Sequence, residues 1–437
     1  MANPQVLEKL QKLMQGLADP CLEAYQPNFA ETDLTYADLS LSDLNAWNFA
    51  GSNLRGSYLL CTNLKKTILT NAILTQANLS GAILWFAEMT GANLYEADLR
   101  GASLTNATLN EANLERANLW RTELKDAQIC RANFSYVNLN RSNLKGANLA
   151  GTKLCHANLC NAELQGVSLL GCDLTGANLT GANLTNVNLT NANLTKANLT
   201  NTNLSRADCT DADFSDVNGT NLNLSDAIAH GTNFEGIELA GANLRGLKIN
   251  GETLLEKKGR LILQIITYGA YAQDLSGVDL RGANLRGANL GKTNLSDADL
   301  SGANLRYANL SDVNLTNAKL TNTNLRDVNL IHGQLRNSNL EKANLTNSLL
   351  YNTDLTGAIL HEAKLLKAQL WDADLSRVQL SHAVLTGASL KNAKLYQVDL
   401  SDTNLTVVEL ANTIFTDCLG IDAEAQAELR ERGAIFA

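Results

Sequence analysis

Residues 174–205 read LTGANLTGANLTNVNLTNANLTKANLTNTNLS, and their pattern extends over most of this 437-residue chain. A leucine recurs at every fifth position, a small residue stands two places before it, and Asn or Asp lies between them. A period of five fits neither the period of two of a plain β-strand nor the 3.6 of an α-helix. It is typical of a coiled array of short, similar units.

The odd number of residues in each unit predicts a turn. In extended backbone, residues i and i+2 share a face, so Ala177 and Leu179 point one way and Asn178 points the other. Strict alternation would carry the next leucine to the opposite face, because five is odd. A turn must therefore reset the phase, and Gly176 and Asn186 stand where it is needed. We expect the leucines to fill the interior of a tube and the residues after them to face outward.

Over roughly residues 29 to 415, this pattern resembles the pentapeptide-repeat family. The resemblance implies an all-β fold, a right-handed quadrilateral parallel β-helix (a solenoid) with four repeats and twenty residues per turn. Residues twenty apart would then stack in columns about 4.8 Å apart. Phe214 and Phe234 would stack in one such column, with smaller residues on the neighbouring walls to compensate for their volume. The nearest look-alikes are the long, capped arrays known from cyanobacteria.

The pattern predicts five segments. They are an N-terminal helical cap (1–28), a first solenoid (29–249), an apolar insert with a register slip (250–274), a second solenoid (275–415) and a C-terminal helical cap (416–437). The insert is expected to be a helix or a hairpin turning at Lys257-Lys258-Gly259. Asn3-Pro4 would begin the first cap helix, Asp422 would be the N-cap of the second, and Gly433 would end it. Such caps cover the exposed sheet edges at the ends of a solenoid.

Composition favours a cytoplasmic protein without a metal centre. Charged residues interrupt the apolar face of the first 19 residues, and no apolar run is long enough to span a membrane. Eight cysteines without a secretion signal predict reduced thiols. Cys155, His156 and Cys160 resemble a metal cluster in the linear sequence. The two cysteines would project from adjacent walls, however, so we expect surface thiols and no metal site.

No sequence feature indicates an enzyme. The chain lacks a phosphate-binding loop, a nucleophile elbow and a zinc-protease motif, and a leucine-filled tube leaves no ordinary pocket, so no catalytic residue and no cofactor is expected. Outward threonine columns permit an ice-binding interpretation, although threonine is common on any β surface. We predict a non-enzymatic interaction or scaffold solenoid that presents a rigid surface to a protein partner, as a monomer or weak dimer. Neither a membrane nor a nucleic acid is expected as a partner.

The alternative function is regulation by DNA mimicry. Some proteins of the family that this chain resembles imitate duplex DNA and bind DNA gyrase. The net charge of −9 is mild for mimicry over this length, and Asp208, Asp211 and Asp213 fall on different columns. The interaction surface is therefore the first hypothesis and mimicry the second.

Two surfaces are candidates for partner binding. In the first array, the columns place Lys65 beneath Trp85 and Arg100 beneath Trp120, with Arg121 at the same edge. Plain cation–π pairs would explain this arrangement, but Trp and Arg are also the usual anchors of protein interfaces.

In the second array, Arg286, Arg306 and Arg326 should stack outward in one column, either as a solvated ladder partly paired with Asp327 or as part of a groove. A second column, of Ile331, Tyr351, Trp371 and Lys391, lies on the next wall. Together the columns would form an amphipathic groove for an acidic, aromatic-seeking protein segment. The candidate partner-binding residues of the whole chain are Trp85, Arg100, Trp120, Arg121, Arg286, Arg306, Arg326, Tyr351 and Trp371.

Overall fold

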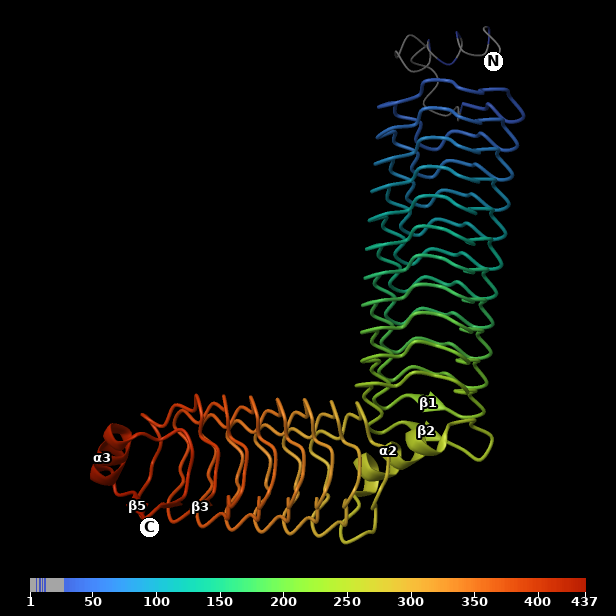
Figure 1. Cartoon of the computed structure of the whole chain (residues 1–437). Helices are drawn as coiled ribbons and strands as arrows, with labels where there is room; N and C mark the ends of the chain where they lie inside the picture. The colour runs from blue at the N-terminus through green and yellow to red at the C-terminus, as the bar shows by residue number, and fades with distance from the viewer. Residues whose placement is uncertain (1–4, 6–7, 9, 11, 13–26) are drawn as a thin grey trace. The chain divides into compact units, whose positions relative to one another are not determined.

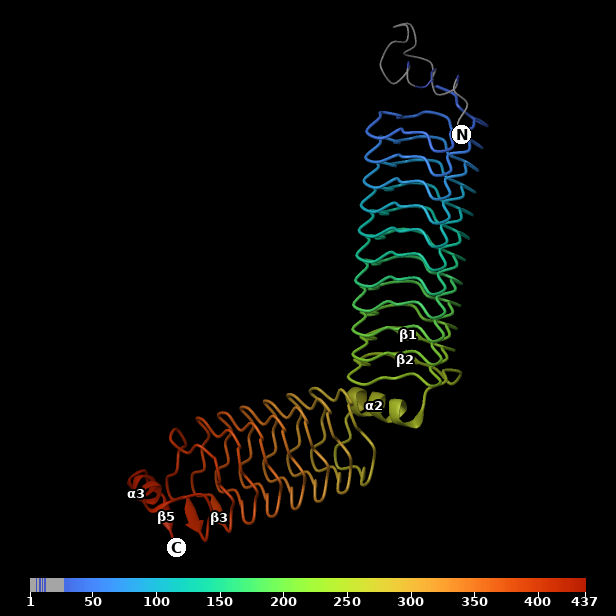
Figure 2. The ribbon, with the colours of Figure 1, turned by 45° about the horizontal axis from the view of Figure 1, so that its top comes forward.

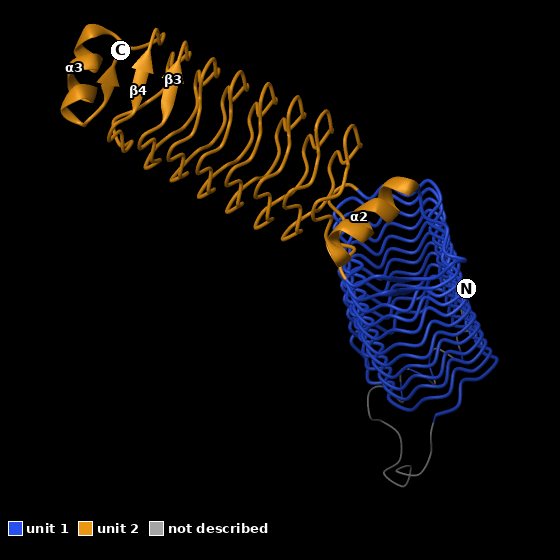
Figure 3. Ribbon diagram, turned by 90° about the horizontal axis from the view of Figure 1, so that it is seen from below, with its two compact units in different colours: residues 1–239, 246–256 blue, residues 240–245, 257–437 orange. Residues whose placement is uncertain are grey.

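The computed structural model describes Gln5, Glu8, Leu10, Lys12 and residues 27–437 (Figure 1). The chain divides into two compact units (Figure 3): residues 1–239 with 246–256 form unit 1, and residues 240–245 with 257–437 form unit 2. Within each unit, short extended segments coil around an axis and successive coils stack (Figure 1, Figure 2). Stacked segments pair in parallel at an interval of twenty residues, as Asn158 with Asn178 in unit 1 and Asn304 with Asn324 in unit 2. Four pentapeptides therefore complete each coil.

Backbone hydrogen bonds fix each coil to its neighbours. In unit 1, the N–H of Leu179 donates to the carbonyl of Asn198 (2.8 Å) on one side, and the N–H of Asn178 donates to that of Ala157 (2.9 Å) on the other. Most paired segments are single bridges. The longer ones are β1 (Ile228–Ala229) and β2 (Lys248–Ile249) in unit 1, and β3 (Lys394–Tyr396), β4 (Ile414–Thr416) and β5 (Ile435–Phe436) in unit 2. β1 pairs with β2, and β3, β4 and β5 form a parallel sheet in that order.

A turn follows each central residue, as the sequence predicted. The N–H of Ala177 donates to the carbonyl of Leu174 (2.9 Å), and Gly176 between them has a φ of +64°. A hydrogen-bonded turn with positive φ at its third residue is of the type II kind, which Gly and Asn tolerate best. Asn186, at the equivalent position of another repeat, has a φ of +57°.

The asparagine between the small residue and the leucine stabilises both the turn and the stack. The Oδ1 atom of Asn178 accepts hydrogen bonds from the backbone N–H (3.1 Å) and the hydroxyl (2.6 Å) of Thr180. Elsewhere the side-chain amide of Asn133 donates to the Oδ1 atom of Asn113, one coil away (3.2 Å). These bonds explain why Asn-Leu-Thr recurs, because Asn readily bonds to backbone two residues further on.

The leucine columns form the interior of both units. Leu184 in unit 1 and Leu330 in unit 2 are each 0% exposed, and burial of one leucine contributes roughly 1.5–3 kcal/mol. The rings of Phe214 and Phe234 lie 5.3 Å apart, which confirms the predicted column. Where Thr replaces the usual Ala, its hydroxyl donates to a backbone carbonyl, either in the preceding coil, as Thr202 does to Leu179 (2.7 Å), or in its own coil, as Thr32 does to Phe29 (2.6 Å). Polar atoms can thus enter the interior without losing their hydrogen bonds.

Helix α2 (Lys257–Tyr268) occupies part of the apolar segment, so the helical alternative is correct and the hairpin is not. Its buried residues are Gly259, Ile262, Leu263 and Ile265. They recur at intervals of three and four and therefore form one face of the helix.

Helix α3 (Ala423–Glu431) and β5 close the C-terminal end of unit 2. The carboxylate of Asp422 accepts the N–H of Ala425 (2.8 Å), which confirms the predicted N-cap, and Gly433 follows the helix with a φ of +90°. The guanidinium of Arg432 donates to the carbonyls of Leu405 (2.7 Å) and Val408 (2.5 Å). The cap therefore provides partners for backbone groups that the last coil leaves open.

Little of the predicted N-terminal cap lies within the described residues. Gln5, Glu8, Leu10 and Lys12 are helical, Leu10 is 1% exposed, and Lys12 pairs with Glu8 at 2.8 Å. The predicted helix start at Asn3-Pro4 lies outside the described residues. Within the part of the chain that the structure describes, no helix has the length and apolar character needed to cross a membrane.

Candidate interaction surfaces

Exposed apolar side chains gather on one wall of unit 1. Parallel pairing of Asn63 with Ile83 and of Ile83 with Ser103 defines the wall. Its exposed residues are Leu41 (78%), Leu60 (42%), Ile83 (38%), Trp85 (41%) and Phe86 (50%), which we name the aromatic wall. Single exposed apolar residues are common on soluble proteins, whereas several on one wall indicate a candidate binding surface.

The ring of Trp85 is held in a defined position. The Nζ atom of Lys65, one coil away, lies 5.5 Å from the ring centre, which confirms the predicted pair. The indole N–H of Trp85 donates to the hydroxyl of Ser103 on the next coil (2.5 Å). An ordered aromatic ring loses little conformational entropy when a partner covers it.

The predicted cation–π pair of Arg100 with Trp120 is wrong, because each side chain contacts a different residue. The two residues share a column, since the N–H of Gly101 donates to the carbonyl of Trp120 (2.9 Å). The Arg100 guanidinium instead pairs with Asp98 (2.6 Å), and Arg121 lies 4.3 Å from the Trp120 ring centre. A bidentate ion pair is stronger than an exposed cation–π contact, so the carboxylate attracts Arg100 away from the ring.

The same ion pair changes the acidity of Asp98. Partial burial alone would raise the pKa of its carboxyl group, but hydrogen bonds from Arg100 and Ser80, together with the charge of Arg100, outweigh burial and hold that pKa below its ordinary value.

In unit 2, the predicted arginine column is present and partly paired. The Asp327 carboxylate lies 3.1 Å from the Nε atom of Arg306 and 3.4 Å from that of Arg326. The side-chain hydrogen bond from Asn347, together with the arginines, keeps the pKa of Asp327 below its ordinary value. Arg286 has a different neighbour, because its guanidinium carbon lies 5.2 Å from the centre of the Tyr307 ring.

The aromatic column of unit 2 is also ordered. The rings of Tyr351 and Trp371 lie 5.0 Å apart, and the Nζ atom of Lys391 lies 5.8 Å from the Trp371 ring. The indole N–H of Trp371 donates to Ser389 (2.5 Å), whose hydroxyl donates in turn to Glu409 (2.6 Å).

The arginine and aromatic columns meet over only part of their length. They flank one wall, in which Asn309 pairs with Asn329 and Asn329 with Leu349. Because columns advance by twenty residues, Arg326 shares a coil with Ile331, and Tyr351 begins on the next coil. The two columns therefore form a diagonal band, and the predicted groove between them does not run alongside all three arginines.

The cysteine and histidine side chains of the described residues have other neighbours than a metal site would require. The Cys155 thiol donates to the Oδ2 atom of Asp173 (2.9 Å). Burial, and to a smaller extent this hydrogen bond, raises the pKa of the thiol to about 11. His361 contacts Glu362 (3.2 Å). Among the described residues, no group of three or more His, Cys, Asp or Glu side chains could hold a metal ion, and the seven cysteines are free.

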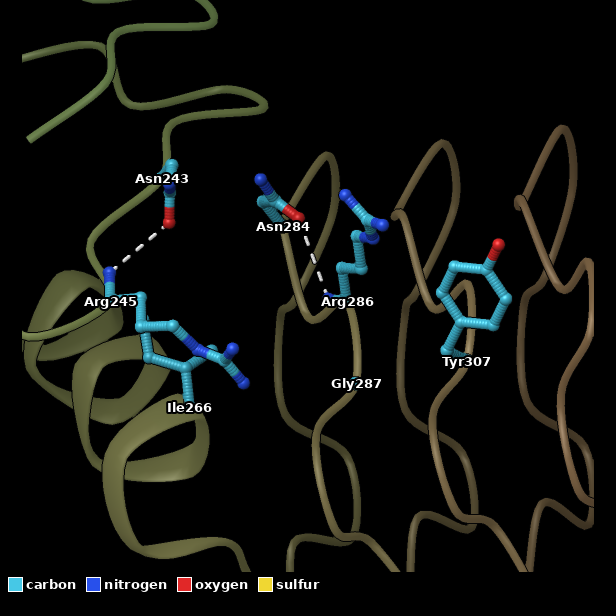
Figure 4. A pocket seen from close by; sticks show the side chains of 7 residues that line it. All are labelled: Asn243, Arg245, Ile266, Asn284, Arg286, Gly287 and Tyr307. Carbon is cyan, nitrogen blue, oxygen red and sulfur yellow. Dashed lines mark hydrogen bonds between the residues drawn. The ribbon is translucent and has the colours of Figure 1, made fainter. Parts of the chain in front are cut away.

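The structure adds a pocket in unit 2 that the sequence analysis missed (Figure 4). It has a volume of about 430 Å³ and is lined by Asn243, Arg245, Ile266, Asn284, Arg286, Gly287 and Tyr307. Residues 240–245 reach it because the N–H of Gly241 donates to the carbonyl of Gly282 (2.8 Å). The segment GANLR occurs at 241–245, 282–286 and 302–306, and the structure brings the first copy to the second. The spacing of 41 between these two copies is not a multiple of twenty, so the column rule does not find it.

Comparison with known proteins supports the repeat pattern. The family model for pentapeptide repeats (8 copies) matches segments that run over residues 48–218, 220–251 and 274–408, more than half of the chain. No protein of curated function matches.

Three solved structures illustrate the similarity. HetL, a pentapeptide repeat protein involved in heterocyst differentiation regulation in the cyanobacterium Nostoc sp. strain PCC 7120, is 29% identical, with coverage of 57% of this chain and 94% of HetL and a TM-score of 0.28. A pentapeptide repeat protein from the Arabidopsis thaliana thylakoid lumen is 28% identical over 32% of this chain and 76% of its own, with a TM-score of 0.17. Full-length QnrB1, a plasmid-mediated fluoroquinolone resistance protein, is 14% identical over 51% and 92%, with a TM-score of 0.17.

Proposed function

Because the chain belongs to the pentapeptide-repeat family, we propose that it is a non-enzymatic interaction solenoid whose rigid surface binds a protein partner. The aromatic wall of unit 1 is the observation that supports this proposal most. We also propose that each unit is the right-handed, four-sided β-helix that the family resemblance implies, and that the protein acts in the cytoplasm as a monomer or weak dimer.

The aromatic wall combines the features of a protein-binding surface. Its backbone is held on both sides by neighbouring coils, so binding requires little ordering of the chain. Trp85 and Phe86 offer large apolar area at one edge of the wall, and Trp120 with Arg121 lies at the opposite edge. Trp and Arg are over-represented among residues that dominate binding energy.

Charge near the wall defines the chemistry of the partner. Lys65 and Lys66 lie one coil before Trp85 and Phe86 in the same two columns, Lys125 lies two coils after Trp85, and Arg121 lies at the opposite edge of the wall. A partner with an apolar patch and an acidic rim would complement this arrangement. Such a rim would mainly accelerate association, whereas the buried aromatic rings would supply most of the affinity.

The test begins with capture of proteins from an extract of the host, identification of the captured protein and its purification. Its affinity is then measured for the wild type and for Trp85→Ala/Phe86→Ala. We expect the double variant to bind at least about thirtyfold more weakly, the effect of losing an interface hot spot of about 2 kcal/mol. Tyr136→Ala is the matched control, since Tyr136 is similarly exposed (52%) on a different wall.

Two further variants separate the surfaces of the two units. Trp120→Ala/Arg121→Glu tests the edge of the aromatic wall, and Arg306→Glu/Trp371→Ala tests the diagonal band of unit 2. If only the unit 2 variant loses binding, the aromatic wall is not the site. If every variant binds like the wild type, the proposed surfaces are both wrong.

DNA mimicry remains the alternative and has its own test. Mimicry requires columns of free carboxylates, but Asp208 and Asp213 accept backbone hydrogen bonds from Thr210 (3.0 Å) and Ser215 (2.9 Å), as turn residues do. Inhibition of gyrase supercoiling at micromolar protein would favour mimicry over the interaction surface. We expect no inhibition.

A further inference from the structure

We propose that the unit 2 pocket binds a phosphoryl group, carried either by a small phosphomonoester or by a phosphorylated residue of a protein. We name it the arginine pocket, after Arg245 and Arg286 in its lining. The inference does not depend on the aromatic wall of unit 1.

Some arginines of the unit 2 column form ion pairs with a carboxylate, and others do not. Arg306 and Arg326 share the carboxylate of Asp327. Within the described residues, no carboxylate lies within the 4.0 Å ion-pair distance of Arg245 or Arg286. Both side chains line the same pocket, so two uncompensated guanidinium groups face one cavity. A phosphoryl group carries about −1.5 to −2 charges at neutral pH and matches them.

Arg286 is held in place before any ligand arrives. Its guanidinium carbon lies 5.2 Å from the Tyr307 ring centre, and that of Arg306 lies 4.4 Å from the same ring. Arg306 also donates to the Tyr307 hydroxyl (2.5 Å), which fixes the ring. A guanidinium oriented in this way loses less freedom on binding an anion.

An asparagine two residues earlier accepts a hydrogen bond from the backbone N–H of each arginine. Asn243 accepts the N–H of Arg245 (3.2 Å) and Asn284 accepts the N–H of Arg286 (3.4 Å), as drawn in Figure 4. The side-chain amide of Asn284 also donates to the carbonyl of Gly241 (3.4 Å), which ties the two arginine-bearing segments together. The asparagines are therefore structural supports, and the arginines are the groups left for a ligand.

The pocket has room for a phosphoryl group and part of the molecule that carries it. Its volume of about 430 Å³ lies within the usual range for small-ligand sites. Gly287, with a φ of +68°, contributes no side chain to the lining. Ile266 of α2 supplies an apolar side that the carrier of the phosphoryl group can contact.

Two arginines from separate segments favour a phosphoryl group over a carboxylate. One carboxylate is satisfied by one bidentate guanidinium, whereas a tetrahedral dianion presents oxygens to two. A monoanion would leave one guanidinium uncompensated. Acetate should therefore bind far more weakly than phosphate.

The experiment is isothermal titration calorimetry of the full chain at constant ionic strength. The probes are inorganic phosphate, phenyl phosphate, acetate, and a phosphoserine peptide with its unphosphorylated counterpart. We expect Arg245→Gln and Arg286→Gln each to weaken phosphate and phenyl phosphate binding at least about tenfold, because each removes charged hydrogen bonds. Arg326→Gln removes the same charge from the same column outside the pocket and should change the affinity by less than about twofold.

The outcomes are distinct. Loss of binding in all three arginine variants would show general charge attraction and overturn the site, as would equal binding of acetate and phosphate or no binding of any phosphorylated probe. If the phosphoserine peptide binds at least about tenfold more tightly than phenyl phosphate, the ligand is a phosphorylated protein; if the two bind alike, it is a small phosphomonoester. Trp85→Ala/Phe86→Ala should leave phosphate binding unchanged, so the proposed function and this inference can fail separately.

Discussion

Units 1 and 2 each have an interior of stacked leucines, but the residues on their outer surfaces differ. In unit 1, Trp85 and Trp120 each have one cation over the ring, Lys65 and Arg121 respectively. In unit 2, arginines gather around Tyr307 and Asp327. An interior position touches side chains from every wall, so few residue types fit it. An outward position touches only its column and turn neighbours, and a repeat array can therefore carry unrelated surfaces.

The largest expected change in stability comes from replacing a core leucine in each unit. Leu184→Lys in unit 1 and Leu325→Lys in unit 2 each bury an ammonium group among leucines, where both parent residues are 0% exposed. We expect each to cost several kcal/mol, because an unpaired charge is placed in an apolar interior. Hydrogen exchange should accelerate mainly in the unit that carries the change.

The control is Thr185→Lys, which places the same charge on the exterior and should be nearly neutral. If Thr185→Lys and Leu184→Lys melt together, the assignment of inside and outside is wrong. If Leu184→Lys accelerates exchange equally in both units, they unfold as one and the comparison fails.

Buried threonine hydroxyls test whether the interiors of the two units are equivalent. Thr202 donates to the Leu179 carbonyl at 2.7 Å in unit 1, and Thr323 donates to the Leu300 carbonyl at 2.9 Å in unit 2. Thr202→Val and Thr323→Val should each lower the free energy of unfolding by about 1 kcal/mol, the net value of one hydrogen bond. Urea unfolding measures both, and clearly unequal costs would show that the interiors differ.

Ser57→Ala is the matched comparison for the hydroxyl variants. The Ser57 hydroxyl is buried and has no hydrogen-bond partner among the described residues. Its removal should leave the free energy of unfolding unchanged or raise it slightly, since no bond is lost. A loss near 1 kcal/mol would mean that this hydroxyl is satisfied after all.

The exposed tryptophans should contribute less. Trp85→Ala and Trp371→Ala each remove a ring that is 41% or 37% exposed, and exposed cation–π contacts are worth roughly 0.5–1 kcal/mol. We expect the Trp371 variant to be the less stable of the two, because Trp371 also contacts Tyr351 and begins the hydrogen-bond chain through Ser389 to Glu409. Melting curves of both variants test this order.

The smallest effect at any single residue should be acid sensitivity. Asp98 in unit 1 and Asp327 and Asp354 in unit 2 have pKa values below the ordinary value. A lowered folded-state pKa contributes stability above the ordinary carboxyl pKa of about 3.9, and this contribution disappears as the pH falls through the folded-state value. The melting temperature should therefore fall below about pH 4. Asp327→Asn should reduce this dependence; an unchanged pH profile would contradict the role of Asp327.

Local features of the sequence were sufficient for much of the fold. The turn at Gly176, the buried column through Leu184, the stack of Phe214 on Phe234 and the N-cap at Asp422 each depend on residues a fixed interval apart. Pairings chosen among several side chains were harder. Arg100 had a ring and a carboxylate within reach, and only the bidentate geometry with Asp98 showed which one it contacts.

The sequence by itself determined the period, the inside and outside of each coil and the position of every turn, because the leucine, the small residue and the turn residue each satisfy a backbone or packing requirement within one repeat. Only the tertiary structure decided that residues 257–268 form a helix and that Arg245 lines a pocket with Arg286. The register slip removes the twenty-residue rule at that point, so the contact of residues 240–245 with the coil at 282–287 follows from packing in three dimensions.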